Sequence, residues 1–340
     1  MSSISMGRAA WARPFLFARC LLAFWLGGLA LLVTATNRAF ADNYPERQIT
    51  MIVPFAAGGP TDVVARIVAA HMSQTLGQPI AIENIVGAGG TAAATHAARA
   101  PNDGYTLIVG HMGTHAAAVP LYPKLPYDPR TDFEPIGLLT DNAMLILARK
   151  EFPATDLAQF AAYLKAHTDT INVAHAGVGS VSYVSCELLD SLLGVRPTGV
   201  SFNGTAPAMA ALIAGQVDYM CDQVVNAVPQ LKAGTILAYA VATPARNPAL
   251  PQVPTTAEAG LPAFQASAWN ALFAPKGTPA PVVAMLNAAA VKALDDETVR
   301  MKLLDLGSRI PTPEARTPAA LAALVTSEII RWSAVLKAAN

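Results

Sequence analysis

The feature that most constrains this 340-residue chain is a strand, glycine loop and helix unit that recurs along it. In its first copy, residues 48–68, an apolar run is interrupted by AAGGP and followed by apolar residues at helical spacing. Similar patterns predict later strands at residues 79–86, 105–110, 171–174, 200–202 and 216–221. Strands that alternate with helices in this way predict an α/β fold of doubly wound domains.

The first glycine loop is suited to binding an anion. The first amides of a helix have no intrahelical partner, and the helix dipole adds partial positive charge there. Gly59 and Thr61 are therefore placed to hold a small anion without lysine or arginine. The simpler alternative is that Gly58 and Gly59 only form the turn, and that Thr61 or Asp62 only caps the helix.

The N-terminal segment predicts export to the periplasm. Three arginines precede an apolar run at residues 21–33, and AFA follows at 39–41, which is the pattern of a signal peptide, residues 1–41, cleaved before Asp42. The apolar run is shorter than the roughly 20 residues that span a bilayer. Residues 1–41 hold four arginines and no acidic residue, so the remaining chain has 19 basic and 23 acidic side chains. This net charge of −4, without a basic patch, gives no support for a nucleic-acid partner.

The second and third loops each raise a competing hypothesis. Gly87, Gly89 and Ala92 match a dinucleotide fingerprint, but the next strand does not end in the acidic residue that would hold a ribose. His111 and His115 are four residues apart, but no Cys, Asp or Glu near them completes a metal shell. We therefore predict no cofactor and no metal, and expect these loops to line a ligand site.

The loops of the second half again combine glycine with hydroxyl or amide side chains. Ser180 follows GVG but is not in a G-x-S-x-G motif, and no base and orienting acid are evident for it as a nucleophile. Asp222 follows the strand at residues 216–221. It either accepts a hydrogen bond from a ligand or caps the next helix, and the cap is the simpler interpretation.

Two cysteines, Cys186 and Cys221, remain after export to an oxidising compartment. They are 35 positions apart, and a disulfide closing such a loop contributes about 3 to 4 kcal/mol on the chain-entropy estimate. We favour this bridge over two buried thiols.

The connections between the two halves are also suggested by the pattern. Strands predicted at residues 136–139 and 143–148 cross into a second domain, and a strand at 268–274 returns. Trp269 is placed to line the mouth between the domains or simply to pack. Helices end the chain at residues 280–294, 296–306 and 318–337.

Six segments distributed along the chain, taken together, are specific to one protein family: PERQITMIVPFAAGGPTDVVAR, ENIVGAGGTAA, APNDGYTLIVG, PAMAALIAGQVDYMCD, PQVPTTAEAGLPAF and FAPKGTPAPVVAMLN. Through them, residues 45–338 resemble the extracytoplasmic receptors of tripartite tricarboxylate transporters, often called the Bug family. The resemblance implies a type II periplasmic-binding-protein fold, in which two doubly wound α/β domains are joined by crossover strands and hold a ligand in their cleft. On that template, residues 42–142 plus 266–340 form lobe 1, and residues 143–265 form lobe 2.

The resemblance also implies how a ligand is held. Family members bind a small carboxylate through loop amides, hydroxyls and ordered water, with little use of basic side chains. Position by position, the implied ligand-binding residues are Gly59, Thr61, Asp62, Gly87, Gly89, Gly90, Thr114, Gly179, Ser180, Asn203 and Gly204. Asp222 is added as a candidate acceptor, and His111, Met112 and Trp269 are candidate contacts for the rest of the ligand.

The function that the resemblance implies is that of a monomeric periplasmic receptor and not an enzyme. Such a receptor closes two lobes over a small carboxylate and delivers it to integral membrane transporter subunits. One alternative is an exported hydrolase or transferase that uses Ser180, His175 and Asp222. A second alternative is a binding protein that serves signalling instead of uptake.

Overall fold

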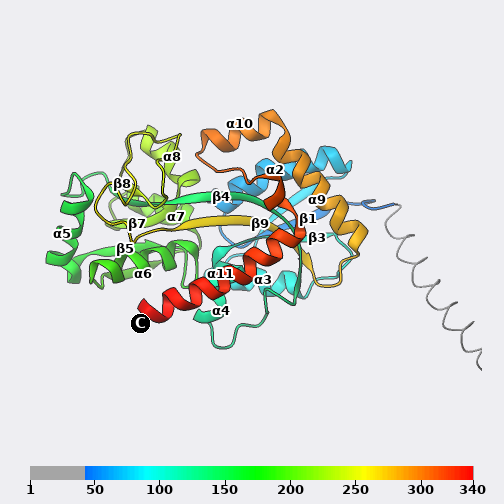
Figure 1. Ribbon diagram of the computed structural model, residues 1–340, viewed down its shortest axis with the longest axis horizontal. Coiled ribbons are helices and arrows are strands. Elements are labelled where there is room, and N and C mark those ends of the chain that lie inside the picture. The colour runs from blue at the N-terminus through cyan, green and yellow to red at the C-terminus, as the bar shows by residue number, and fades with distance from the viewer. Residues whose placement is uncertain (1–42, 340) are drawn as a thin grey trace, which may run out of the picture. The chain divides into compact units, whose positions relative to one another are not determined.

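The computed structural model describes residues 43–339, so the predicted signal peptide lies outside the described residues. Within them, nine strands form a sheet in the order β2-β1-β3-β9-β4-β7-β5-β6, and β8 pairs with β4 (Figure 1). The strands are β1 Ile49–Val53, β2 Ile80–Asn84, β3 Thr106–His111, β4 Phe133–Arg149, β5 Asn172–His175, β6 Thr198–Ser201, β7 Tyr219–Gln223, β8 Ile236–Val241 and β9 Ser267–Pro275. The α/β fold predicted from the sequence is confirmed.

Two parallel groups of strands make up the two ends of this sheet. β1 pairs in parallel with β2 and β3, and β5 pairs in parallel with β6 and β7. The antiparallel strands β4 and β9 run side by side between the two groups (Figure 1). Each parallel group therefore has carboxyl ends from which loops can reach a common site.

Helices follow most of the strands, as the recurring unit predicts. The longer helices are α2 Pro60–Leu76, α3 Thr91–Ala98, α5 Leu157–His167, α6 Val181–Leu193, α7 Thr205–Ile213, α8 Val224–Lys232, α9 Ala280–Asp295, α10 Glu297–Asp305 and α11 Pro318–Ala339. Short helical turns are η1 Ala88–Gly90, the π-helical η2 Gly113–Ala117, α4 Ala118–Leu121, η3 Thr168–Thr170 and η4 Pro313–Arg316.

β4 corrects the prediction of two separate strands at residues 136–139 and 143–148. It is one continuous strand whose first part pairs with β9 and whose last part, from Met144, pairs with β7 and β8. The polar residues between the predicted strands suggested a break, but Thr140 and Asn142 are buried inside the sheet and hydrogen-bonded there. The residues from Pro45 onward form one compact unit, and the division into two lobes stays a prediction.

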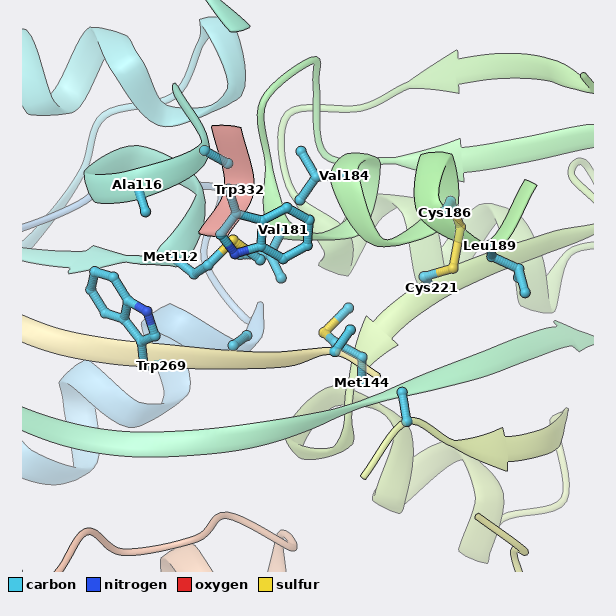
Figure 2. Close-up of a cluster of buried hydrophobic side chains, with 14 of the residues drawn as sticks. Met112, Ala116, Met144, Val181, Val184, Cys186, Leu189, Cys221, Trp269 and Trp332 are labelled. Atoms are coloured by element: carbon cyan, nitrogen blue, oxygen red, sulfur yellow. A yellow bond between two sulfur atoms is a disulfide. The ribbon is translucent and has the colours of Figure 1, made fainter. Parts of the chain in front are cut away.

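The hydrophobic core joins elements from distant parts of the chain. Figure 2 shows Trp332 of α11 beside Val181 and Val184 of α6, with Met112 and Trp269 in the same cluster. Trp269 and Met112 are thus core residues, and neither lines the pocket described below. Figure 2 also shows the disulfide that joins Cys186 of α6 to Cys221 of β7, the pairing favoured from the sequence, with Cα atoms 5.4 Å apart.

Among the described residues, one helical stretch, Pro318–Lys337 within α11, is long and apolar enough to cross a membrane by length and composition alone. Core helices of globular proteins satisfy the same criteria. Leu321, Val325 and Trp332 of this helix are buried in the core, which accounts for its apolar face.

Candidate functional site

A pocket lies where loops from the carboxyl ends of β1, β3, β5, β6 and β7 meet. The enclosed cavity is small, about 20 Å³, which is room for about one water molecule. The lining residues are Phe55, Gly59, Pro60, Thr61, His111, Ala176, Ser180, Val181, Ser182, Thr205, Asp222 and Gln223. Loops beyond the carboxyl ends of parallel strands are the usual place for ligands in α/β folds.

Four helices begin at this pocket. Gly59 is the N-cap of α2, Ser180 is the N-cap of α6, Thr205 starts α7, and Gln223 is the N-cap of α8. The first turns of these helices carry amides without intrahelical partners and the positive ends of the helix dipoles. None of the lysines and arginines among residues 43–339 lines the pocket, so any positive electrostatic potential in it comes from these backbone dipoles.

Two serines provide a hydroxyl donor. Ser180 Oγ accepts a hydrogen bond from the amide of Tyr183 (3.2 Å), and Ser182 Oγ accepts one from the amide of Ala176 (2.9 Å). The two hydroxyls also lie 3.1 Å apart and share one hydrogen bond. Because two hydroxyl protons are present and only one is used between them, the other remains for a ligand.

A buried amide network connects the pocket to the two central strands. Thr61 Oγ1 donates to Asn270 Oδ1 on β9 (3.1 Å), so its proton is not available to a ligand. Asn270 and Asn142 of β4 both donate to Gln223 Oε1, at 3.3 and 2.8 Å. The side chains of Thr61 and Gln223 are therefore held by β9 and β4, and Thr61 has its amide left for binding.

Asp222 is the acidic residue of the pocket. It is 1% exposed and accepts hydrogen bonds from the Gln223 amide and the Asn226 side chain. Burial raises its pKa to about 7, although these hydrogen bonds act in the opposite direction. The predicted helix cap is wrong, because the N-cap of α8 is Gln223 and Asp222 belongs to β7.

Asp62 lies beside the first loop without lining the pocket. Its carboxylate accepts from the Gly58 amide (2.9 Å), from Arg66 and from Asn84. Burial alone would raise its pKa, but these hydrogen bonds hold the pKa below the ordinary value. Asp62 therefore stabilises the turn at the start of α2, and both of its carboxylate oxygens already accept hydrogen bonds from the protein.

The second glycine loop contacts the GVGS loop and not the pocket. Gly89 lies so close to the GVGS loop that an added Cβ would overlap the carbonyl of Val178, and an added Cβ at Gly90 would lie 2.8 Å from Thr114. The Tyr122 hydroxyl reaches both loops, 3.1 Å from Ala88 O and 2.6 Å from Val178 O. These glycines permit a close approach of two loops.

The NGT loop makes a second contact of this kind. Asn203 O accepts from the Ala56 amide at 3.0 Å, and Gly204 packs against Ala56. Of the predicted ligand-binding residues, Gly59, Thr61, Ser180 and Asp222 line the pocket. The others do not line it: Asp62, Gly87, Gly89, Gly90, Thr114, Gly179, Asn203 and Gly204.

Several lining residues were not predicted as ligand contacts. Ser182 and Thr205 follow the predicted Ser180 and Gly204 within two residues, so the hydroxyl pattern of those loops could have indicated them. For Gln223, nothing in the neighbouring sequence indicates that it lines a pocket.

His111 was predicted only as a candidate contact for part of the ligand. In the structure it is fully buried, and its ring stacks on Phe55 with centroids 5.0 Å apart.

The arrangement needed by the hydrolase hypothesis is not assembled. The hydroxyl of Ser180 bonds to Ser182 and to a backbone amide, whereas His175 Nδ1 accepts from the Gly177 amide. Asp222 bonds to Asn226 and not to a histidine. Across the described residues there is also no group of three or more His, Cys, Asp or Glu side chains that could hold a metal.

Comparison with known proteins identifies relatives over nearly the whole described chain. Residues 64–340 match the family model described as the tripartite tricarboxylate transporter family receptor. The UPF0065 protein in the TAR-I ttuE-ttuC′ intergenic region of Agrobacterium vitis is 42% identical over 316 residues, which cover 92% of this chain and 91% of that protein.

Solved structures agree with this match. The structure of MatC from Rhodopseudomonas palustris with bound malate is 61% identical, with a TM-score of 0.84, and covers 86% of this chain and 99% of its own. The periplasmic binding protein BugD is 43% identical, with a TM-score of 0.85, and covers 87% of this chain and 98% of its own.

Proposed function

Because this chain belongs to the tripartite tricarboxylate transporter receptor family, we propose that it is a periplasmic receptor for a small dicarboxylate of the size of malate. The carboxylate is held by the amides that start α2, α6 and α7 and by the Ser180–Ser182 hydroxyl pair. The receptor delivers its ligand to the integral membrane subunits of a tripartite transporter.

The observation that carries this proposal is a pocket at which four helices begin and which no cationic side chain of the described residues lines. Amides at helix starts hold carboxylates by charge-assisted hydrogen bonds, and these bonds strengthen when water is excluded. The enclosed cavity of about 20 Å³ is smaller than such a ligand, so the loops around it must move apart for the ligand to enter and be held. Malate bound to MatC supports this ligand class, because MatC is similar over 86% of the chain.

The loop contacts support a closure mechanism. Lobe 1 as predicted contributes Ala56 and Gly89, and lobe 2 contributes Asn203 and Val178, which face them. These contacts hold the pocket shut from both sides, and the receptor opens by parting them. A closed shape is what a membrane partner can distinguish from an open one.

Isothermal titration of the mature chain tests the proposal. We expect L-malate and succinate to bind, and malamide, the uncharged diamide of malate, to bind at least 100-fold more weakly. Equal binding of malate and malamide would contradict an anion site, and no binding of any dicarboxylate in a wider panel would refute the receptor function. Delivery is tested by uptake of labelled malate into proteoliposomes that contain the membrane subunits, with and without this receptor.

A further inference from the structure

We propose that His111 selects the ligand through a fixed, uncharged N–H donor, Nε2–H, which hydrogen-bonds a carboxylate or hydroxyl oxygen of the bound molecule. This inference rests on the proposed function and names a specificity-determining residue of the same pocket. His111 is the last residue of β3 and lines the pocket.

The tautomer of the ring follows from its hydrogen bonds. His111 Nδ1 accepts from the amide of Gly113 at 2.8 Å and from the amide of Thr114 at 3.3 Å. A ring nitrogen that accepts from amides carries no proton, so the hydrogen of the neutral ring resides on Nε2. The turn at the start of η2 therefore fixes which nitrogen is the donor.

The ring is also uncharged at neutral pH. His111 is 0% exposed, and burial lowers its pKa to about 3. The titratable groups nearby are His115, which is itself buried and neutral, and Asp222 across the pocket. The ring acts as a donor of one hydrogen bond and not as a cation that attracts any anion.

The donor atom has no partner within the described residues. His111 Nε2 is buried and makes no hydrogen bond. A buried N–H group without an acceptor is costly, so such groups are rare in folded proteins. Phe55 covers a face of the ring, and Nδ1 is turned to its own loop. The Nε2–H group is therefore the remaining donor of the His111 side chain and can hydrogen-bond a ligand in the pocket.

His115 provides a matched control in the same segment. It is equally buried and neutral, with an unpaired Nε2. Its ring packs between Phe273 and Phe133, with centroid distances of 4.1 and 4.7 Å, and it does not line the pocket. A change at His115 thus removes a buried neutral histidine without removing a pocket donor.

The first test is calorimetry with L-malate and succinate on three variants. We expect His111→Phe to weaken binding at least 10-fold, and His111→Gln, whose amide can reach the same position, to retain affinity within about threefold. His115→Phe keeps the affinity of the unaltered protein. A loss confined to malate assigns the donor to the hydroxyl, and an equal loss for both ligands assigns it to a carboxylate.

The second test observes the ring in the unaltered protein and is needed if His111→Phe does not fold. Proton–nitrogen correlation spectra should show His111 as the Nε2–H tautomer from about pH 5.5 to 8, and malate should shift its Nε2–H resonance. An Nδ1–H tautomer, a charged ring, an unmoved resonance or full affinity of His111→Phe would each overturn this inference. Absence of binding by the unaltered protein would instead refute the receptor function.

Discussion

Replacing Asp222 by asparagine probes the electrostatics of the pocket. Asp222 lies in a pocket without lysine or arginine, and burial raises its pKa from 3.8 to about 7. A shift of about three pKa units corresponds to about 4 kcal/mol of preference for the protonated form. Asparagine is neutral at every pH and can still accept from the Gln223 amide, so Asp222→Asn removes the charge and keeps the shape.

The pH dependence of stability has a definite sign. The folded pKa is raised, so the contribution of Asp222 to stability is fully present below about pH 4 and is lost as the pH rises through about 7. We expect Asp222→Asn to equal the unaltered protein in stability near pH 3.5 and to exceed it by up to about 4 kcal/mol near pH 8. Urea unfolding at several pH values measures this difference, and parallel curves for the two proteins would refute the reasoning.

Ligand binding should follow the same titration. At a separation of about 5 Å and an effective dielectric constant of about 20, an ionised Asp222 and a ligand carboxylate repel each other by about 3 kcal/mol. We expect malate to bind more tightly as the pH falls from about 8.5 to 6, with uptake of a proton. Asp222→Asn should bind without this dependence. Calorimetry in buffers of different ionisation enthalpy measures the proton directly.

Asp190 is the matched control for this experiment. Its pKa is also raised to about 7, chiefly by burial, but it bonds to Tyr219 and does not line the pocket. Asp190→Asn should change the pH dependence of stability and leave proton uptake on binding unchanged. If Asp190→Asn abolished the linked proton and Asp222→Asn did not, the charge that matters to the ligand would lie outside the pocket.

Three further changes test other contacts. Gly89→Ala should weaken malate binding at least 10-fold, because its Cβ would overlap the facing loop, whereas Gly194→Ala, with a similar positive φ but open space, should leave affinity intact in the same titration. Replacing both Cys186 and Cys221 by serine should cost about 3 to 4 kcal/mol in urea unfolding, and a loss below 1 kcal/mol would contradict that estimate. Ser182→Ala should lower malate affinity by about 1 to 3 kcal/mol, and it should also lower the melting temperature because the Ala176 amide loses its acceptor; unchanged affinity would assign the donor hydroxyl elsewhere.

The strand and helix pattern was predictable because it is local. Each βα unit has an apolar run, a glycine turn and an apolar stripe at helical spacing, and all three signals lie within about 20 residues. The continuous strand β4 was not predicted from the sequence, because Thr140, Asp141 and Asn142 have the polar composition of a loop. Their polar groups have partners on β9, on β7 and at Arg309. Each of these partners is more than 80 positions away, so the sequence around β4 does not reveal it.

The glycines of the loops show where sequence reasoning about the site stops. A glycine signals that something comes close to the backbone, but it does not specify what. At Gly59 the neighbour is the pocket, whereas at Gly89 it is the carbonyl of Val178. The loop of Gly89 and the loop of Val178 are almost 90 positions apart and meet only in the folded chain, so the distinction cannot be made from either loop alone.

His111 and Asp222 illustrate one cause with two opposite effects. Burial disfavours the charged form of any group, so it lowers the pKa of the histidine to about 3 and raises that of the aspartate to about 7. At pH 7 the His111 ring is therefore neutral, and Asp222 is protonated in about half of the molecules. The net attraction for an anion must then come from the helix amides, which are already oriented and need no side-chain charge. Because those dipoles are buried, salt should weaken binding far less than it would for a pocket with exposed lysines or arginines.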